Sequence, residues 1–209
     1  MTQETKVGLY DSSFDRDSCG FGLIANIDYQ PSHWVVKTAI DSLKRLTHRG
    51  AVSADGKTGD GCGLLLKFPK KFFLAKAREL NIDVYEEFAV GTIFLDPREA
   101  ITKKVKKKIE SAIVKEGLEC AGWRKVPINS EVCGEMALNT LPNIEQIFVN
   151  CPQNISSENF NRRLFLARRR AEQDIKELDS STYINSLSSE TISYKGMVMP
   201  NALATFYQI

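Results

Sequence analysis

Apolar positions along the chain follow two spacings, and these predict interleaved strands and helices. Residues 20–27 form a nearly continuous apolar run that stops at Asp28, which is typical of a buried strand. From Trp34 the apolar residues recur at helical spacing, the pattern ends at Gly50, and Ser32 is placed to cap the start of this helix. Residues 1–18 have no apolar period and are interpreted as a leader or arm.

The two spacings continue to the end of the sequence without an internal repeat. Strands are predicted over residues 62–68, 88–96, 122–128, 144–151 and 190–198. Helices are predicted over residues 70–80, 101–113, 157–177 and 201–209. A loop rich in Gly and Asp, residues 50–61, links the first helix to the strand that follows it. This alternation indicates a mixed α/β protein.

Composition places the chain among ordinary globular proteins. Its 209 residues are 43% hydrophobic, which is enough for one substantial core. The formal charge of +2 gives no overall case for nucleic acid or an anionic membrane as a partner. No apolar run approaches the length that spans a bilayer, and the N-terminus lacks a signal or transit pattern, so a cytoplasmic location is expected.

Two basic clusters need a separate interpretation. Residues 102–110 (TKKVKKKIE) contain five lysines, and residues 161–172 (NRRLFLARRRAE) contain five arginines. The apolar residues between them keep core spacing, which favours solvated helix faces. A docking surface for the rest of a larger enzyme is the next alternative, and nucleic-acid binding is the third.

The reactive residue types are few. The five cysteines are scattered and never form a C-x-x-C pair, which disfavours a disulfide framework or a zinc site: Cys19, Cys62, Cys120, Cys133 and Cys151. With His33 and His48 as the only two histidines, a histidine-based triad or metal centre has few candidates. We interpret His48 as structural, His33 as a surface residue of a first helical turn, and the last four cysteines as small core or surface thiols.

Cys19 stands where a polar segment changes into an apolar run, in DRDSCGFGLIANI. It is either a small hydrophobic residue at the start of a buried strand or a nucleophile on a strand edge. The glycines of residues 56–63 superficially suggest a phosphate loop, but their spacing fits no known pattern, and Asp55 and Asp60 would repel phosphate. A Gly/Asp turn between helix and strand is the simpler interpretation.

Two stretches carry a resemblance to a known family. CGFGLIA, followed some thirty positions later by LTHRGAVSADGKTGDGCGLLLKFP, resembles the class II glutamine amidotransferase domain that opens the large subunit of glutamate synthases. The matching residues include the run from His48 to Ala51 and the run from Thr58 to Gly61, whereas Cys62 replaces the usual alanine. Looser likeness continues through IEQIFV, ARRRAE and ETISYKGMVMP.

The resemblance implies an N-terminal-nucleophile hydrolase fold, a four-layer αββα sandwich that is incompletely built over residues 19–209. It also implies that residues 1–18 are a propeptide, so that Cys19 becomes the first residue. A free α-amine has a pKa of about 7.7 to 8.0 and can accept the proton of the thiol that attacks glutamine. Gly20 and Gly22 would let substrate and backbone approach this nucleophile.

Arg49 and Gly50 belong to the Leu-Thr-His-Arg-Gly-Ala part of the match. The family has an arginine near the catalytic cysteine at this point, so the resemblance implies that Arg49 stabilises the thiolate or supports the site. An arginine that caps a helix C-terminus is an alternative, and the two roles are compatible.

Other family elements are absent from the sequence. The resemblance implies a later His-x-Arg-Phe strand that holds the carboxylate of L-glutamine and an Asn-Gly-Glu segment that forms the oxyanion hole, and neither occurs here. The isolated polypeptide is therefore expected to be inactive, with the remainder of the glutamate synthase large subunit, or a complementary chain, as its partner. FMN and an iron–sulfur cluster are expected only in that remainder, where ammonia would meet 2-oxoglutarate.

Two further alternatives remain open. Another class II amidotransferase, making an amino sugar, phosphoribosylamine or asparagine, would share the cysteine and the Arg-Gly pair, although the Thr-Gly-Asp-Gly turn argues against it. A non-catalytic relic would keep the fold without the chemistry.

Overall fold

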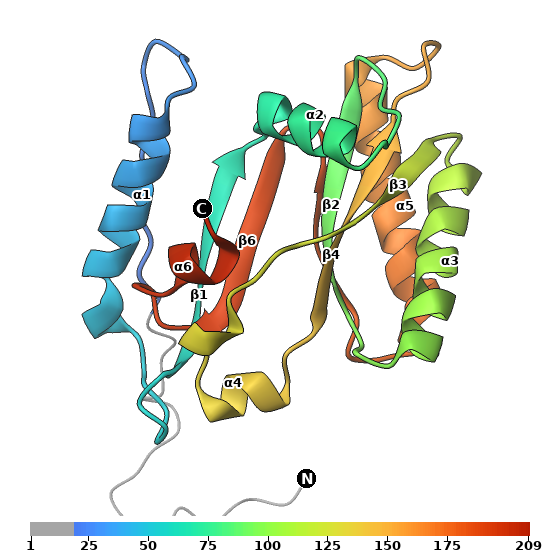
Figure 1. Cartoon of the computed structure of the whole chain (residues 1–209). Coiled ribbons are helices and arrows are strands. Elements are labelled where there is room, and N and C mark those ends of the chain that lie inside the picture. The colour runs from blue at the N-terminus through green and yellow to red at the C-terminus, as the bar shows by residue number, and fades with distance from the viewer. Residues whose placement is uncertain (1–18) are drawn as a thin grey trace, which may run out of the picture.

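The computed structural model describes residues 19–209, so the predicted propeptide, residues 1–18, lies outside the described residues. Six α-helices, two 3-10 helices and six strands follow one another in this part of the chain (Figure 1). In order they are α1 (His33–Arg45), η2 (Thr47–Arg49), β1 (Thr58–Lys67), α2 (Lys70–Glu79), β2 (Phe88–Leu95), α3 (Glu99–Lys115), β3 (Glu119–Lys125), η3 (Ser130–Val132), α4 (Glu135–Asn139), β4 (Asn143–Asn150), α5 (Ser157–Lys176), β5 (Tyr183–Ser188), β6 (Thr191–Val198) and α6 (Leu203–Tyr207).

The strands form two antiparallel sheets. The larger sheet has four strands in the order β3-β4-β2-β5, and the smaller sheet pairs β1 with β6. Helices α3 and α5 lie side by side on one face of the larger sheet (Figure 1). The fold is therefore mixed α/β with two antiparallel sheets, as the alternation of periods predicted.

The central strand β2 separates two hydrophobic cores. Because successive side chains of a strand point to opposite faces, Ala89 and Ile93 face α3 and α5. Phe88 and Val90 face the smaller sheet and helices α2, α4 and α6. Burial on both faces explains why residues 88–95 are almost continuously apolar instead of alternating.

Helix α1 is the least embedded long helix. It has no fully buried residue and stands at the outer margin of the molecule beside β1 (Figure 1). The Ser32 hydroxyl accepts a hydrogen bond from the amide of Val35 at 3.4 Å, so the predicted cap is confirmed. A second turn, η2, continues toward Gly50, which is where the sequence pattern ends.

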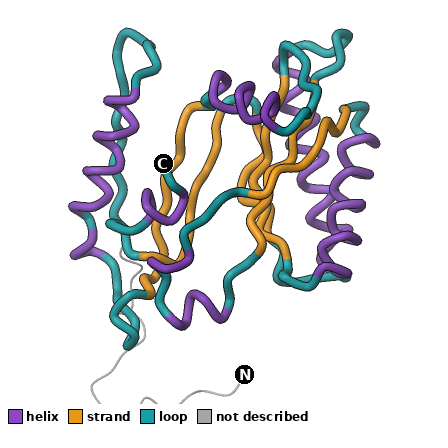
Figure 2. The backbone as a smooth tube through the Cα atoms, in the orientation of Figure 1, coloured by secondary structure: helices purple, strands orange, loops and turns teal. Residues whose placement is uncertain are grey.

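The predicted strand over residues 20–27 is wrong. The segment is loop, as Figure 2 shows for the whole stretch before α1. Its apolar side chains lie in solvent, with Phe21 94%, Leu23 86% and Ile27 91% exposed. A strand needs a hydrogen-bonded neighbour, and no other described segment pairs with this one.

One strand and one α-helix were not predicted from the sequence. Strand β5, YINSLS, is too polar to show a strand pattern, yet four of its six side chains are buried because it pairs with β2. Helix α4 has only five residues, which is too short for a helical period to appear. No helix among residues 19–209 is long and apolar enough to cross a membrane.

Substitution of Phe148 tests the packing of the core between the two sheets. Its side chain is fully buried, with ring centroids 6.0 Å from Phe73 and 6.3 Å from Phe88. We expect Phe148→Ala to lower the free energy of unfolding by about 3 to 5 kcal/mol, measured by urea denaturation. Phe165→Ala, at a position 60% exposed on α5, is the matched control and changes it by less than about 1 kcal/mol. Equal losses for both variants would contradict this packing.

Candidate active site

Cys19 is exposed, and its neighbour Gly20 lies against the end of the first helix. A β-carbon built on Gly20 would lie 3.8 Å from Cβ and Cγ of Arg49 and 3.8 Å from Cδ2 of Leu46. Nothing lies within 4 Å of such an atom at Gly22. The structure therefore brings the residue beside the predicted nucleophile next to the predicted arginine, and it leaves open space beside Gly22.

Arg49 is positioned by the turn that follows α1. Helix α1 ends at Arg45 with Leu46 as its C-cap, η2 follows directly, and the amide of Arg49 donates to the carbonyl of Leu46 at 2.8 Å. Nδ1 of His48 lies 2.9 Å from the carbonyl oxygen of Arg45, so this ring is engaged by the helix end. Arg49 is thus an exposed residue at the carbonyl end of a helical turn, where a positive charge is favoured, and its first side-chain carbons lie against Gly20.

Residues 50–61 fold into a tight hairpin that leads from η2 into β1. Three cross-strand contacts join its arms: the amide of Asp60 to the carbonyl of Ala51 at 3.3 Å, the bridge between Val52 and Gly59, and the amide of Ser53 to the carbonyl of Thr58 at 2.9 Å. Gly56 has a φ of +69° at the tip, which glycine adopts without strain. The segment is a structural turn, in line with the simpler of the two interpretations above.

Two glycines of the hairpin permit close backbone approaches. A β-carbon on Gly59 would lie 2.8 Å from the carbonyl oxygen of Val198, so β1 and β6 could not meet here with any other residue. A β-carbon on Gly50 would lie 3.0 Å from Oδ1 of Asp60, which is a tight contact. The carboxylate of Asp60 therefore lies beside the residue that follows Arg49.

Asp55 and Thr58 cap helix α4 from the hairpin, an arrangement that we name the Asp55 cap. Asp55 Oδ1 accepts from the Thr58 amide at 2.7 Å, and Oδ2 accepts from the Thr58 hydroxyl at 2.5 Å and from the Met136 amide at 3.2 Å. The Thr58 hydroxyl accepts from the Ala137 amide at 3.3 Å. These hydrogen bonds, led by the one from the Thr58 hydroxyl, lower the pKa of the Asp55 carboxyl, which therefore stays ionised.

Sequence reasoning missed the Asp55 cap. The only local signal is an aspartate three residues before a threonine, which is common in turns. The link to α4 joins positions about eighty residues apart, and no spacing rule predicts it.

Gly134 provides a test of the Asp55 cap. A β-carbon at this position would overlap the Asp55 carboxylate and the Thr58 hydroxyl. We expect Gly134→Ala to displace the hairpin and lower the free energy of unfolding by about 2 kcal/mol or more, measured by urea denaturation. Gly22→Ala is the control, since it meets no atom within 4 Å. Equal stability of the two variants would show that the hairpin is not held in this way.

The environments of the five thiols differ. Burial, together with nearby carboxylates, raises the pKa of Cys62 and of Cys120 to about 11. Burial also raises the pKa of the Cys133 and Cys151 thiols. These four side chains are therefore protonated near neutral pH and poor nucleophiles, whereas Cys19 is exposed.

Alkylation tests this difference. We expect iodoacetamide at pH 8 to modify Cys19 first, because a thiol of pKa about 11 is ionised there in only about one molecule in a thousand. Peptide mass spectrometry measures the rate at each cysteine, and labelling in concentrated urea is the control in which all five react. Native Cys133 reacting as fast as Cys19 would contradict the structure.

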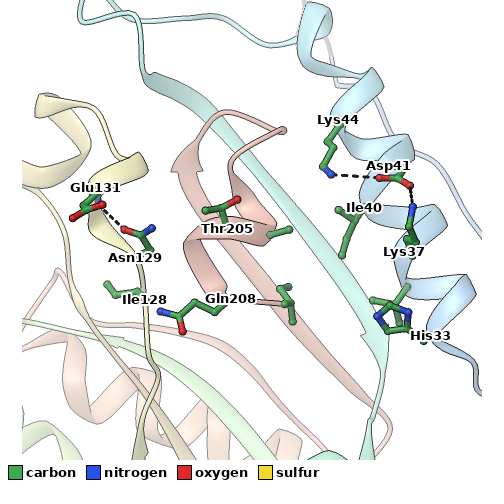
Figure 3. Close-up of a pocket in the computed structure, with 13 residues that line it drawn as sticks. His33, Lys37, Ile40, Asp41, Lys44, Ile128, Asn129, Glu131, Thr205 and Gln208 are labelled. Atoms are coloured by element: carbon green, nitrogen blue, oxygen red, sulfur yellow. Dashed lines mark hydrogen bonds and ion pairs between the residues drawn. The ribbon is translucent and has the colours of Figure 1, made fainter.

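A groove between α1 and the C-terminal part of the chain is separate from these residues (Figure 3). Its volume is about 820 Å³, and its walls come from α1, residues 128–131 and residues 204–209. Asp41 bridges Lys37 and Lys44 along its rim at 2.7 and 3.4 Å, and these lysines lower the pKa of the Asp41 carboxyl. Cys19, Gly20, Arg49 and Gly50 do not line this groove.

The two basic clusters lie on α3 and α5, in the layer remote from α1 (Figure 1). Several of their cations pair with nearby carboxylates: Lys106 with Glu145 at 2.7 Å, Arg168 with Glu172 at 2.8 Å and Arg170 with Glu116 at 2.9 Å. Buried apolar side chains occupy the opposite side of each helix. This arrangement fits solvated helix faces and gives these residues no place beside Cys19.

Comparison with protein families matches residues 19–209 to the family of class-II glutamine amidotransferases. The matched range begins at Cys19 and contains every described residue.

Comparison with curated proteins finds similarity to glutamate synthases. The chain is 41% identical over 207 residues to the glutamate synthase [NADPH] large chain of Azospirillum brasilense, covering 97% of this chain and 14% of that protein. It is 39% identical over 203 residues to ferredoxin-dependent glutamate synthase 1 of Arabidopsis thaliana, covering 95% and 12%. It is 36% identical over 201 residues to the glutamate synthase [NADPH] large chain of Bacillus subtilis, covering 96% and 13%. The chain thus spans about an eighth of the length of these relatives.

Proposed function

The chain belongs to the class-II glutamine amidotransferases, and on this premise we propose that it is the glutaminase portion of a glutamate synthase, acting on L-glutamine through Cys19. The observation that supports the proposal is that Gly20, the residue beside the exposed Cys19, lies against the first side-chain atoms of Arg49. Similarity to glutamate synthases over nearly the whole chain supports the choice among amidotransferases.

The proposed reaction has two steps at Cys19. The sulfur attacks the side-chain amide carbon of glutamine, a carbon–sulfur bond forms, the carbon–nitrogen bond breaks, and the thiol proton leaves with ammonia. Water then attacks the resulting γ-glutamyl thioester, which releases glutamate and restores the thiol. Removal of residues 1–18 would give Cys19 a free α-amine with a pKa of about 7.7 to 8.0, able to carry the proton between the two steps.

Arg49 and the hairpin after it are proposed to support this site. The place of Arg49 at the end of η2 fixes its backbone beside Gly20, from which its side chain would support the site. Gly50 allows the close approach of Asp60, while Gly20 lies in ordinary contact distance of Arg49.

A four-layer αββα sandwich is the proposed complete architecture. Helices α3 and α5, the larger sheet and the smaller sheet supply three layers in order. Helix α1, amphipathic and unburied beside β1, is a candidate for the fourth.

The remainder of the large subunit is the proposed partner and the proposed holder of FMN and the iron–sulfur cluster. A cluster needs converging cysteines, and no three side chains of His, Cys, Asp or Glu converge among residues 19–209. These residues therefore do not fit the cluster, and no redox step is assigned to them. Ammonia would be used on 2-oxoglutarate outside this segment. A cytoplasmic location remains a prediction.

The isolated 209-residue polypeptide is proposed to have negligible glutaminase activity. Its sequence contains no Asn-Gly pair and no histidine after His48, so the family's oxyanion and carboxylate-binding segments must come from elsewhere. Loss of one oxyanion donor alone lowers a rate by about a hundredfold to a thousandfold.

A chimera tests the function in a full-length context. Residues 1–209 replace the matched portion of the Azospirillum brasilense large chain, and glutamine-dependent and ammonia-dependent glutamate formation are both measured. We expect glutamine-dependent activity that is abolished by Cys19→Ala and retained in Cys120→Ala. We also expect the intact mass of the active protein to correspond to a chain whose first residue is Cys19.

The ammonia-dependent rate reports whether the rest of the chimera is folded. A chimera that uses ammonia but not glutamine would overturn the proposed function. Retention of residues 1–18 in an active protein would overturn the role of the α-amine alone.

A further inference from the structure

The outer layer of α3 and α5 concentrates positive charge on one side of the protein. Helix α3 contains six lysines and two glutamates, and α5 contains six basic and three acidic residues, so the two helices together carry a formal charge of +7. The whole chain carries +2, so the rest of the sequence is net acidic. Because the two helices lie side by side on one face of the larger sheet, these charges share one layer (Figure 1).

Much of this positive charge has no acidic partner within the described chain. Ion pairs with glutamates occupy Lys103 and Lys106 on α3 and residues 168–170 on α5. The ion pairs among residues 19–209 leave out five exposed cations of the two helices: Lys104, Lys107, Lys108, Lys115 and Arg162. A cluster of this kind attracts an acidic surface across about 10 Å at moderate ionic strength.

Two large apolar side chains lie among the cations of α5. Phe165 is 60% exposed and Leu166 is 42% exposed, whereas the other apolar residues of this helix are buried. Helical spacing places them on the same side as Arg162 and Arg169, because residues i, i+3, i+4 and i+7 are neighbours on a helix surface. Aromatic residues and arginine are enriched in protein–protein interfaces. We name the five exposed cations, together with Phe165 and Leu166, the basic face.

A cleft with acidic walls adjoins the basic face at one end of the larger sheet. Its volume is about 1090 Å³, and the charged residues that line it are one lysine and three glutamates: Lys70, Glu86, Glu87 and Glu119. Ser157, the first residue of α5, also lines the cleft. Tyr85, which is 40% exposed, lines it as well and donates its hydroxyl proton to Glu119 at 2.8 Å. We name this feature the acidic cleft.

We propose that the basic face of one copy of this chain docks against the acidic cleft of a second copy in a two-fold symmetric dimer. Because the two surfaces adjoin, a two-fold axis beside them lets each copy present its basic face to the cleft of the other, so the contact forms twice. The exposed rings of Phe165 and Tyr85 supply apolar surface at each contact. This inference is independent of the proposed function.

A second copy is favoured over nucleic acid as the occupant. The complementary surface is present in the chain itself, and the three glutamates of the acidic cleft also take part in no ion pair among residues 19–209. Single-stranded nucleic acid is bound on several aromatic side chains beside the cations, and the basic face has one such ring, that of Phe165.

Reversal of charge on each surface tests the dimer. The basic-face variant is Lys108→Glu with Arg162→Glu, and the cleft variant is Glu86→Lys with Glu119→Lys. All four side chains are exposed, so circular dichroism of each variant is expected to match that of the unaltered chain. Light scattering after size exclusion measures the mass. We expect a dimer of the unaltered chain at low salt, and a dissociation constant raised at least about tenfold by either variant or by about 0.5 M sodium chloride.

A mixture of the two variants is the sharper test. The basic-face variant has two acidic surfaces and the cleft variant has two basic ones, so both contacts can form between them. We expect an equimolar mixture to form a heterodimer that binds at least about tenfold more tightly than either variant binds itself. Lys57→Glu with Lys67→Glu is the matched control, because it changes the net charge as the basic-face variant does, at exposed positions of the hairpin and β1, and leaves the dimer intact.

The possible outcomes decide both the contact and its occupant. A monomer at low salt, a dimer that either variant still forms, or a mixture that stays monomeric overturns the proposal. Oligomers longer than the dimer overturn the two-fold arrangement. A chain that stays monomeric while its basic face binds single-stranded DNA assigns this surface to nucleic acid instead. Glutamine hydrolysis is not a readout here, so failure of the proposed function leaves these outcomes unchanged.

Discussion

The pairing of β2 with β4, buried on both faces, is the constraint on which the rest of the structure depends. Eight residues of each strand pair in register, and their side chains alternate between the two cores. One core requires the apolar stripes of α3 and α5, whose outer faces are then free to carry lysine and arginine. The other core requires the smaller sheet and the short helices around it. The position of β1, and hence of the hairpin before it, follows from this second requirement.

Around the candidate site, close backbone approaches matter more than side-chain packing. Gly59 allows β1 to meet β6, Gly50 accommodates Asp60, and Gly134 accommodates the Asp55 cap. Each is a position where one added carbon would displace a neighbour. The hairpin is thereby held against β6 and α4, and Arg49 precedes it in the chain.

Residues 51–209 and residues 19–49 have different physical roles. Residues 51–209 provide stability through two buried cores, whereas residues 19–49 carry an exposed thiol, an exposed cation and exposed apolar side chains. Segments that bind and react are commonly the less stable ones, because they must be able to move or to pair. The four remaining thiols lie among residues 51–209, where burial raises their pKa, and Cys19 is the exposed thiol of the described residues.

The local spacing of apolar residues was sufficient to predict most elements. An amphipathic helix has an apolar stripe, and a strand buried on both faces has a continuous apolar run, so each is recognisable from its own residues. The capped helix α1, the stripe of α3 and the central strand β2 were all predictable in this way, and the family motif indicated Cys19, Arg49 and Gly50. Tertiary structure alone decided that polar β5 is buried, that the apolar run at residues 20–27 is not, and that Asp55 reaches α4. In each case the deciding factor is distant in sequence: pairing with β2 buries a polar strand, no described strand pairs with the apolar loop, and a long-range hydrogen bond leaves no trace in local spacing.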